Sequence, residues 1–83
     1  MSYRLLYTTL AQKDIKKLDN VAKRRLKKKL EFLGMDPIGN SKKLIHPDLG
    51  TYRFRVGDYR VIFDLHGKDI VVLRVGHRRE IYR

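Results

Sequence analysis

The sequence predicts a small α+β domain of two layers, with the element order β-α-α-β-β-β and two helices packed on one face of a mainly antiparallel sheet. Two stretches in the first half of the chain place apolar side chains at helical spacing. The last third, 52–83, instead alternates apolar and polar residues and is broken by Gly57 and Gly67. The 83 residues contain no internal repeat, low-complexity tract or linker, so residues 1–83 are expected to form a single domain.

The chain opens with Tyr3–Thr8, whose alternation of aromatic or apolar residues with others predicts the first strand. Thr9, followed by Gln12, fits the capping box that begins a helix. A short amphipathic helix is therefore expected over Leu10–Leu18. Its buried stripe consists of Ala11, Ile15 and Leu18.

A second helix is predicted over Val21–Leu33, after a break and new cap at Asp19-Asn20. Gly34 is placed to end it, and Pro37 prevents its continuation. Its buried stripe consists of Ala22, Leu26, Leu30 and Leu33. The opposite side is rich in lysine and arginine, which fits either a nucleic-acid contact or a solvated face. No aromatic or amide side chain is interleaved there to read bases, and both interpretations stay open.

A long surface loop is expected over Met35–Gly50, because this segment contains prolines and glycines and has little periodicity. His46 and Asp48 lie within it and could in principle bind a metal ion. No further His or Cys lies nearby to complete a ligand set, and the intervening proline favours a turn. We therefore predict no metal site.

The first hairpin of the last third is formed by Tyr52–Val56 and Tyr59–Phe63, joined by Gly57-Asp58. A two-residue loop with Gly first suits a type II′ turn. The resulting register gives one apolar face and places Arg55 directly opposite Arg60 on the other face. Like charges opposite each other destabilise a sheet. Either the register is wrong or this face binds an anion.

The second hairpin turns at Gly67 and returns through Val71–Val75. The apolar face decides its register. The expected pairs are Val61 with Val75, Phe63 with Leu73, and Leu65 with Val71. Arg74 then lies beside Ile62, within diagonal reach of Asp64, so we expect an ion pair between Arg74 and Asp64. Arg78, if the strand continues that far, joins the same polar face as Arg53, Arg55 and Arg60.

The charge balance is strongly basic, with 20 Lys and Arg against 9 Asp and Glu, a formal net charge of +11 and a pI near 10.3. Such an excess points to a polyanion such as nucleic acid, or to an acidic protein partner. The absence of cysteine excludes a disulfide framework. No apolar run is long enough to span a membrane, and no signal peptide is apparent, so a cytoplasmic location is expected.

The arginine-lined face suits a ligand with several phosphates, since guanidinium groups bind phosphate in a bidentate geometry. RNA can be cut without metal when its own 2′-OH attacks the adjacent phosphorus, leaving a cyclic phosphate and a 5′-OH. The protein must then supply a base, an acid and cations for the developing charge. Arg53, Arg55 and Arg60 are candidates for the cations, and His77 and Tyr82 for the proton carriers.

The proton carriers remain open at this point. His77 titrates in the right range, but strict alternation points it away from Arg78 unless the strand ends or bulges at Gly76. Tyr82 needs neighbouring arginines to lower its pKa, or it simply packs its ring. Arg78 stays protonated and therefore suits charge stabilisation better than proton donation.

The segments GDYRVIF at 57–63 and VGHRREIYR at 75–83 resemble those of the RelE/ParE superfamily of bacterial and archaeal type II toxins. The resemblance covers essentially the whole chain, including the order of strands and helices. It implies a RelE-like fold. Within the superfamily, the RelE branch cleaves mRNA in the ribosomal A site without metal or cofactor, whereas ParE-type members poison DNA gyrase.

The residue matches favour the RelE branch. Arg53 and Arg55 correspond to its RNA-binding basic residues, Arg60 to its central transition-state arginine, Arg78 to the arginine after the last strand, and Tyr82 to its terminal catalytic tyrosine. RelE usually carries lysines at the first two positions, which retains the charge but changes any role in proton transfer. The segment between Arg78 and Tyr82 is also short.

The resemblance further implies two kinds of partner: a RelB-like antitoxin that folds around the toxin and inhibits it, and the ribosomal A site with its mRNA and rRNA. Neither a membrane nor a small-molecule cofactor is expected. The alternatives are a ParE-like gyrase inhibitor without nuclease activity, and a binding module that keeps only the fold and the antitoxin contact.

Overall fold

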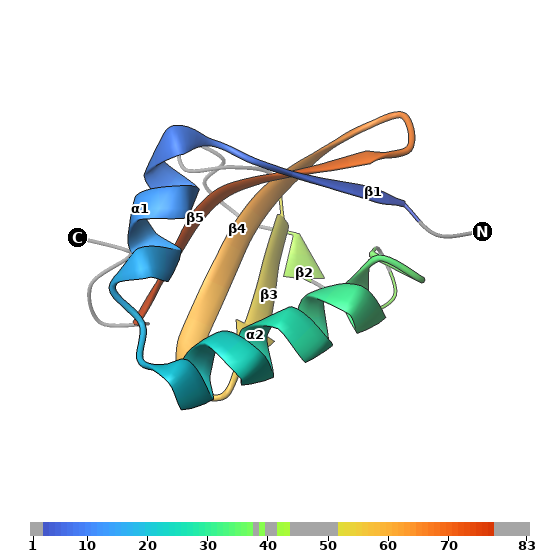
Figure 1. The fold of residues 1–83 in the computed structure, drawn as a ribbon. Coiled ribbons are helices and arrows are strands. Elements are labelled where there is room, and N and C mark those ends of the chain that lie inside the picture. Colours follow the sequence, from blue (N-terminus) through green and yellow to red (C-terminus); the bar gives the residue numbers. More distant parts are fainter. Residues whose placement is uncertain (1–2, 38, 40–41, 44–51, 78–83) are drawn as a thin grey trace.

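The computed structural model describes residues 3–37, 39, 42–43 and 52–77. Its elements are β1 (Arg4–Tyr7), α1 (Thr9–Lys16), α2 (Asn20–Leu33), β2 (Lys42–Lys43), β3 (Tyr52–Val56), β4 (Tyr59–His66) and β5 (Asp69–His77). They form one sheet in the order β1-β5-β4-β3-β2, with both helices on the same face (Figure 1). β1 runs parallel to β5 and every other pair is antiparallel. The predicted α+β fold class and its mainly antiparallel sheet are confirmed.

The two helices begin at side chains that accept hydrogen bonds from the first turn, as unpaired amides there require. Asp19 Oδ1 accepts from the Ala22 amide at 2.7 Å and starts α2 as predicted. For α1 the predicted cap is wrong by one residue. Thr8, and not Thr9, is the cap, because its Oγ1 accepts from the Ala11 amide at 3.1 Å.

The segment predicted as an unbroken loop contains a short strand. β2 pairs with the beginning of β3, with Lys42 opposite Arg53 and Lys43 opposite Tyr52. Two residues are too few to show an alternation in the sequence, which is why this strand was not predicted. His46 and Asp48 lie outside the described residues.

Both two-residue turns depend on a glycine. Gly57 and Gly67 each have a φ of 60°, and no described residue other than glycine has a positive φ. A positive φ at the first turn position but not at the second distinguishes type II′ from type I′ turns. The type II′ turn predicted for Gly57-Asp58 is therefore confirmed.

Replacing Gly57 by alanine is expected to destabilise the fold by roughly 1–2 kcal/mol, because an L-residue is strained at this φ. The added Cβ would also approach Arg25 Nη1 to 3.3 Å. Asp58→Ala, at the next turn position, is the control and should change stability by less than about 0.5 kcal/mol. Urea denaturation of both variants measures the difference. Equal stabilities would contradict the turn assignment.

The β3–β4 register matches the prediction at every pair. Arg55 lies opposite Arg60, and Phe54 lies opposite Val61. Phe54, Val56 and Val61 are buried, which fixes the helix side of these strands. Since successive side chains point to opposite faces, the arginines lie on the face away from the helices.

The β4–β5 pairing begins as predicted and then shifts. Val61 lies opposite Val75, and Ile62 lies opposite Arg74. A bulge follows between Ile62 and Phe63, so that β5 contributes one extra residue there. The two strands diverge from the predicted register only beyond this point.

The predicted pairs beyond the bulge are wrong by one residue. The structure pairs Phe63 with Val72 and Leu65 with Ile70, in place of Leu73 and Val71. Ile70 and Val72 are both fully buried. Each lies an odd number of residues before Val75, so strict alternation would put them on the opposite face. The extra residue brings all three onto the helix side.

The core lies between the helices and the middle of the sheet. Its buried members are Ala11, Leu26, Leu30, Leu33, Phe54, Val56, Val61, Phe63, Ile70, Val72 and Val75. Three of the four residues of the predicted α2 stripe are among them, while Ala22 is half-buried. Tyr52 stacks on Phe63 from the neighbouring strand, with ring centroids 5.4 Å apart.

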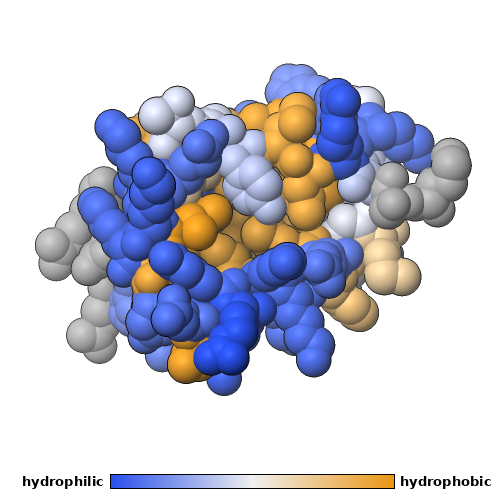
Figure 2. Space-filling model, viewed as in Figure 1, coloured by the Kyte–Doolittle hydropathy of each residue, from blue (hydrophilic) through white to orange (hydrophobic). Residues whose placement is uncertain are grey.

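The outer side of α2 is basic and exposed. Its exposed cations are Arg24, Arg25, Lys27, Lys28 and Lys29. Figure 2 shows hydrophilic side chains over both helices, with apolar surface between them. Exposed cations are expected both if this side of α2 is only solvated and if it contacts nucleic acid, so the exposure does not distinguish the two interpretations. Within the described part of the chain, no helix is long and apolar enough to cross a membrane.

Candidate functional site

The basic row on the open face of the sheet is formed by neighbouring strands β3 and β4. Arg55 and Arg60 lie directly opposite each other, and Arg53 lies opposite Ile62. We call Arg53, Arg55 and Arg60 the arginine row. Two adjacent guanidinium groups repel each other unless an anion lies between them. The structure thus brings together three of the residues that the sequence predicted for phosphate binding.

The side chains of the arginine row are held in different ways. Arg55 Nε donates to the carbonyl oxygen of Gly57 at 3.0 Å, which ties this side chain to the end of the hairpin. The Nε atoms of Arg53 and Arg60 are buried. Among the described residues, Arg53 Nε has no hydrogen-bond acceptor. A buried donor without an acceptor costs roughly 1–3 kcal/mol.

The surroundings of Arg60 suit close approach by a ligand. On the neighbouring strand β5, Arg60 lies opposite Gly76, which has no side chain to cover this part of the face. Next along β4 on the same face is Ile62, which is fully buried. A buried apolar neighbour lowers the local dielectric, which strengthens the attraction between guanidinium and phosphate.

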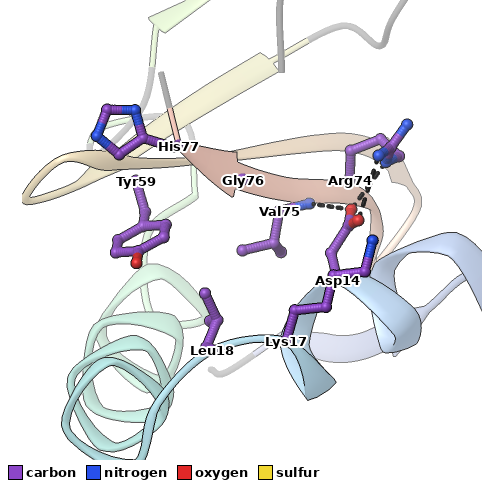
Figure 3. A pocket seen from close by; sticks show the side chains of 8 residues that line it. All are labelled: Asp14, Lys17, Leu18, Tyr59, Arg74, Val75, Gly76 and His77. Atoms are coloured by element: carbon purple, nitrogen blue, oxygen red, sulfur yellow. Dashed lines mark hydrogen bonds and ion pairs between the residues drawn. The ribbon is translucent and has the colours of Figure 1, made fainter. Parts of the chain in front are cut away.

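Arg74 forms an ion pair, as expected, but its partner is not the expected one. Arg74 pairs with Asp14 of α1, where Asp64 was predicted. Its Nε donates to Asp14 Oδ2 at 2.8 Å, and its Nη2 donates to Oδ1 at 3.2 Å. The Val75 amide also donates to Oδ2, at 3.0 Å (Figure 3). Asp14 therefore binds both the side chain and the backbone of β5.

The Asp14 carboxylate lies beside the part of β5 that no longer pairs with β1. β1 pairs with β5 only as far as Val72. Beyond it, Thr8 Oγ1 donates to the Leu73 carbonyl oxygen at 2.9 Å, and Asp14 accepts from the Val75 amide. Side chains of α1 and its cap thus replace a neighbouring strand at this edge of β5.

The pKa of Asp14 reflects two opposing effects. Burial alone would raise the pKa, because it disfavours the charged carboxylate. The hydrogen bonds from Arg74 and the Val75 amide, and the charges of Arg74 and Lys17, favour the carboxylate and together outweigh burial. The pKa of Asp14 is therefore lowered from its ordinary value.

A lowered folded-state pKa predicts a defined pH dependence. The contribution of Asp14 to stability is fully present above its unfolded pKa of about 3.9 and is lost as the pH falls through the lower folded pKa. At neutral pH we expect Asp14→Asn to cost about 1–2 kcal/mol, a value reduced because the Arg74 side chain is 43% exposed.

Urea denaturation at pH 6 and pH 3 measures this contribution. The difference in unfolding free energy between wild type and Asp14→Asn should shrink at the lower pH. Asp69, whose pKa is lowered chiefly by its hydrogen bond from Arg4, titrates in both proteins and cancels in the comparison. A difference that is the same at both pH values would contradict the role of the Asp14 carboxylate.

His77 lies apart from the arginine row. It is paired with Tyr59, and the two rings meet edge to face with centroids 6.0 Å apart. Both rings line a cavity of about 310 Å³ that also includes Lys17 and Leu18 (Figure 3). The structure therefore groups His77 with the cavity beside α1 rather than with Arg60.

The remaining predicted site residues, Arg78 and Tyr82, lie outside the described residues. Of the residues that the structure describes, no three His, Asp or Glu side chains are grouped so as to hold a metal ion. The residue whose contact the sequence analysis missed is Asp14, the ion-pair partner of Arg74. It is the only acidic residue of Thr9–Lys16 and directly precedes Ile15 of the apolar stripe, which was the available signal.

Comparison with known proteins relates this chain to toxins. Residues 5–82 match the family described as the ParE toxin of the type II toxin–antitoxin system parDE. Toxin RelG of Mycobacterium tuberculosis is 35% identical over 89 residues, spanning 100% of this chain and 99% of the relative. Toxin RelE3 of Methanocaldococcus jannaschii is 31% identical over 83 residues, spanning 95% and 94%.

Solved structures of the same group share the fold. The toxin–antitoxin complex RelBE2 of Mycobacterium tuberculosis contains a chain with a TM-score of 0.81 and 29% identity, covering 94% of this chain and 100% of that one. The intact Escherichia coli RelBE complex gives a TM-score of 0.76 and 28% identity, covering 92% and 96%. Both neighbours are complexes of a toxin with its antitoxin.

Proposed function

Because the chain belongs to the RelE/ParE superfamily of toxins of type II toxin–antitoxin systems, we propose that it is a ribosome-dependent mRNA endonuclease of the RelE branch. The observation that carries this proposal is the arginine row, in which Arg55 and Arg60 lie directly opposite each other. Such a row suits an RNA phosphate whose charge increases during the reaction.

The proposed reaction uses a nucleophile that belongs to the RNA. The 2′-oxygen forms a bond to the adjacent phosphorus while the bond from phosphorus to the 5′-oxygen breaks. The 2′-OH proton passes to a base, and the leaving 5′-oxygen receives a proton. The products are a 2′,3′-cyclic phosphate and a 5′-OH. An internal nucleophile needs no metal-activated water, so we propose a metal-independent endoribonuclease.

The residues of the arginine row have two roles in this reaction. Arg60 stabilises the charge that builds on the non-bridging oxygens, because it lies between Arg55 of β3 and the uncovered position of Gly76 on β5. Arg53 and Arg55 bind the flanking phosphates of the RNA. We further propose that Arg78 adds to the charge stabilisation. Arginine is suited to these roles because it stays protonated and binds phosphate in two places.

Tyr82 and His77 are the two candidates for the proton transfers. The position of His77 beside Tyr59, in the cavity next to α1, favours Tyr82 as the carrier at the arginine row. We expect Tyr82→Phe to slow single-turnover cleavage by at least about tenfold, the lower part of the range for acid–base groups. His77→Ala, the matched variant, should stay within a few-fold of wild type. The reverse order of the two rates would make His77 the carrier.

We propose a RelB-like antitoxin and the ribosomal A site, with its mRNA and rRNA, as the partners of this toxin in the cytoplasm. The support for the antitoxin is that the related toxins are seen in complex with RelB. The arginine row offers a cationic surface at which an acidic segment of the antitoxin would compete with RNA.

A gyrase-inhibiting toxin without nuclease activity is the second candidate, because the matching family is described as ParE toxin. Adding the purified protein to a cell-free translation reaction and mapping the mRNA ends separates the two. Cuts in phase with codons, ending in a cyclic phosphate and found only with ribosomes present, support the nuclease. Intact mRNA together with accumulated gyrase–DNA cleavage complexes would overturn it in favour of the gyrase inhibitor.

A further inference from the structure

Arg74 belongs to the same face of the sheet as the arginine row. Ile62 of β4 lies opposite Arg53 of β3 on one side and opposite Arg74 of β5 on the other. Two residues earlier on β4, Arg60 lies opposite Gly76 of β5. Arg74 is therefore a diagonal neighbour of Arg60, at roughly 7–8 Å between Cα atoms. A side chain as long as arginine spans this distance. A phosphate that flanks the one bound at Arg60 lies within the reach of Arg74.

Asp14 decides where the Arg74 guanidinium lies. It binds this group through both carboxylate oxygens, at 2.8 and 3.2 Å, in the two-pronged geometry that phosphate would also use. The Asp14 side chain is only 11% exposed and is fixed in addition by the Val75 amide. The Arg74 side chain is 43% exposed and is the less enclosed of the two. The fixed partner is thus the carboxylate and the adjustable one is the arginine.

We propose that Asp14 is a positioning residue that holds Arg74 at the outer edge of β5 and so limits the RNA-phosphate contact to the arginine row. This inference rests on the proposed function. Its consequence is a limit on how tightly intact RNA binds. A contact made equally with substrate and transition state tightens binding without raising kcat, so a fourth arginine would only retain the RNA.

The chain offers a matched control for removing this carboxylate. Asp69 forms a similar two-pronged ion pair with Arg4, at 2.9 and 3.1 Å. Asp69 lies opposite His66 of β4. His66 is six residues along β4 from Arg60, which places this ion pair about 20 Å from Arg60. Asp14→Asn and Asp69→Asn change the net charge equally. Only the first releases an arginine beside Arg60.

The test measures binding of a single-stranded oligoribonucleotide whose 2′-O-methyl groups prevent cleavage, over a series of salt concentrations. Asp14→Asn is expected to bind about 3- to 10-fold more tightly than Asp69→Asn at low salt. Its log Kd should depend more steeply on log salt by about 0.7, the value for one added phosphate contact on a single strand. Equal affinities and equal slopes for the two variants would overturn the inference.

Two further variants keep the test decisive if Asp14→Asn folds poorly. Arg74→Gln should bind the RNA with the affinity and salt slope of Arg4→Gln, which removes the same charge from the other ion pair, because Arg74 makes no contact with the RNA while Asp14 holds it. The double variant Asp14→Asn/Arg74→Gln should lose the gain seen in Asp14→Asn. Weaker binding by Arg74→Gln than by Arg4→Gln, or a gain that persists in the double variant, would each overturn the role assigned to Asp14.

Kinetics on ribosomes separate positioning from a merely structural effect. The inference predicts a lower KM with an unchanged kcat for Asp14→Asn, whereas a lower kcat with unchanged KM would assign only structural support to the pair. Failure of the proposed function has its own signature. Wild type and Arg60→Gln would then bind the RNA equally weakly, whereas Arg60-dependent binding with no effect of Asp14→Asn overturns this inference alone.

Discussion

Replacing Arg60 by alanine is expected to lower the single-turnover rate of mRNA cleavage on ribosomes by at least about 100-fold, the usual loss when a group that stabilises developing charge is removed. The physical reason is its position on β4, opposite Arg55 on one side and Gly76 on the other. The measurement is the rate at which cleaved 3′ ends appear when protein is in excess over programmed ribosomes.

Two controls make this result specific. Arg24→Ala removes the same charge from the exposed side of α2, on the helix face of the sheet, and should leave the rate within a few-fold of wild type. Arg60→Lys keeps the charge but loses the two-pronged contact with phosphate, so its rate should fall between those of wild type and Arg60→Ala. Equal rates for Arg60→Ala and Arg24→Ala would show that net charge, and not this position, matters.

Replacing Phe63 by alanine is expected to have the largest effect on stability, about 3–5 kcal/mol. Phe63 is fully buried in the core and stacks on Tyr52. A domain of 83 residues has a total stability of about 4–12 kcal/mol at the usual value per residue, so this change removes a large part of it. The shift in urea midpoint, with its slope, measures the loss.

Phe32→Ala provides the matched control, since it deletes the same side chain from the exposed side of α2. Phe32 is 56% exposed and should cost less than about 0.5 kcal/mol. A small loss for Phe63→Ala, close to that of Phe32→Ala, would mean that the core does not depend on the middle of β4. The assignment of its apolar face would then be wrong.

The hairpin and the arginine row were predictable because local features determine them. A two-residue turn beginning at Gly57 fixes the β3–β4 register, and alternation then assigns each side chain to a face. No packing information was needed to place Arg55 opposite Arg60. The caps at Asp19 and the end of α2 at Gly34 followed from side-chain chemistry in the same way.

The features that were missed depend on contacts between distant segments. The bulge after Ile62 allows β5 to bury Ile70, Val72 and Val75 on one face, although strict alternation would separate Val75 from the other two. The need to bury all three arises only when β5 packs against the helices. Asp14 reaches Arg74 because α1 lies along the edge of β5, and the sequence does not show this placement. In the predicted sheet register Asp64 lay within diagonal reach of Arg74, but the ion pair forms with Asp14 of the packed helix instead.

The parallel pairing of β1 with β5 has a consequence for how the protein is made. Arg4 and Asp69, joined by an ion pair, are 65 residues apart in the sequence. Closing so long a loop is slow relative to forming a hairpin. During synthesis, β1 has no strand to pair with until β5, 65 residues further along the chain, has emerged, and α1 gains its anchor on β5 at the same stage. The order of synthesis therefore delays completion of the sheet until β5 has been translated.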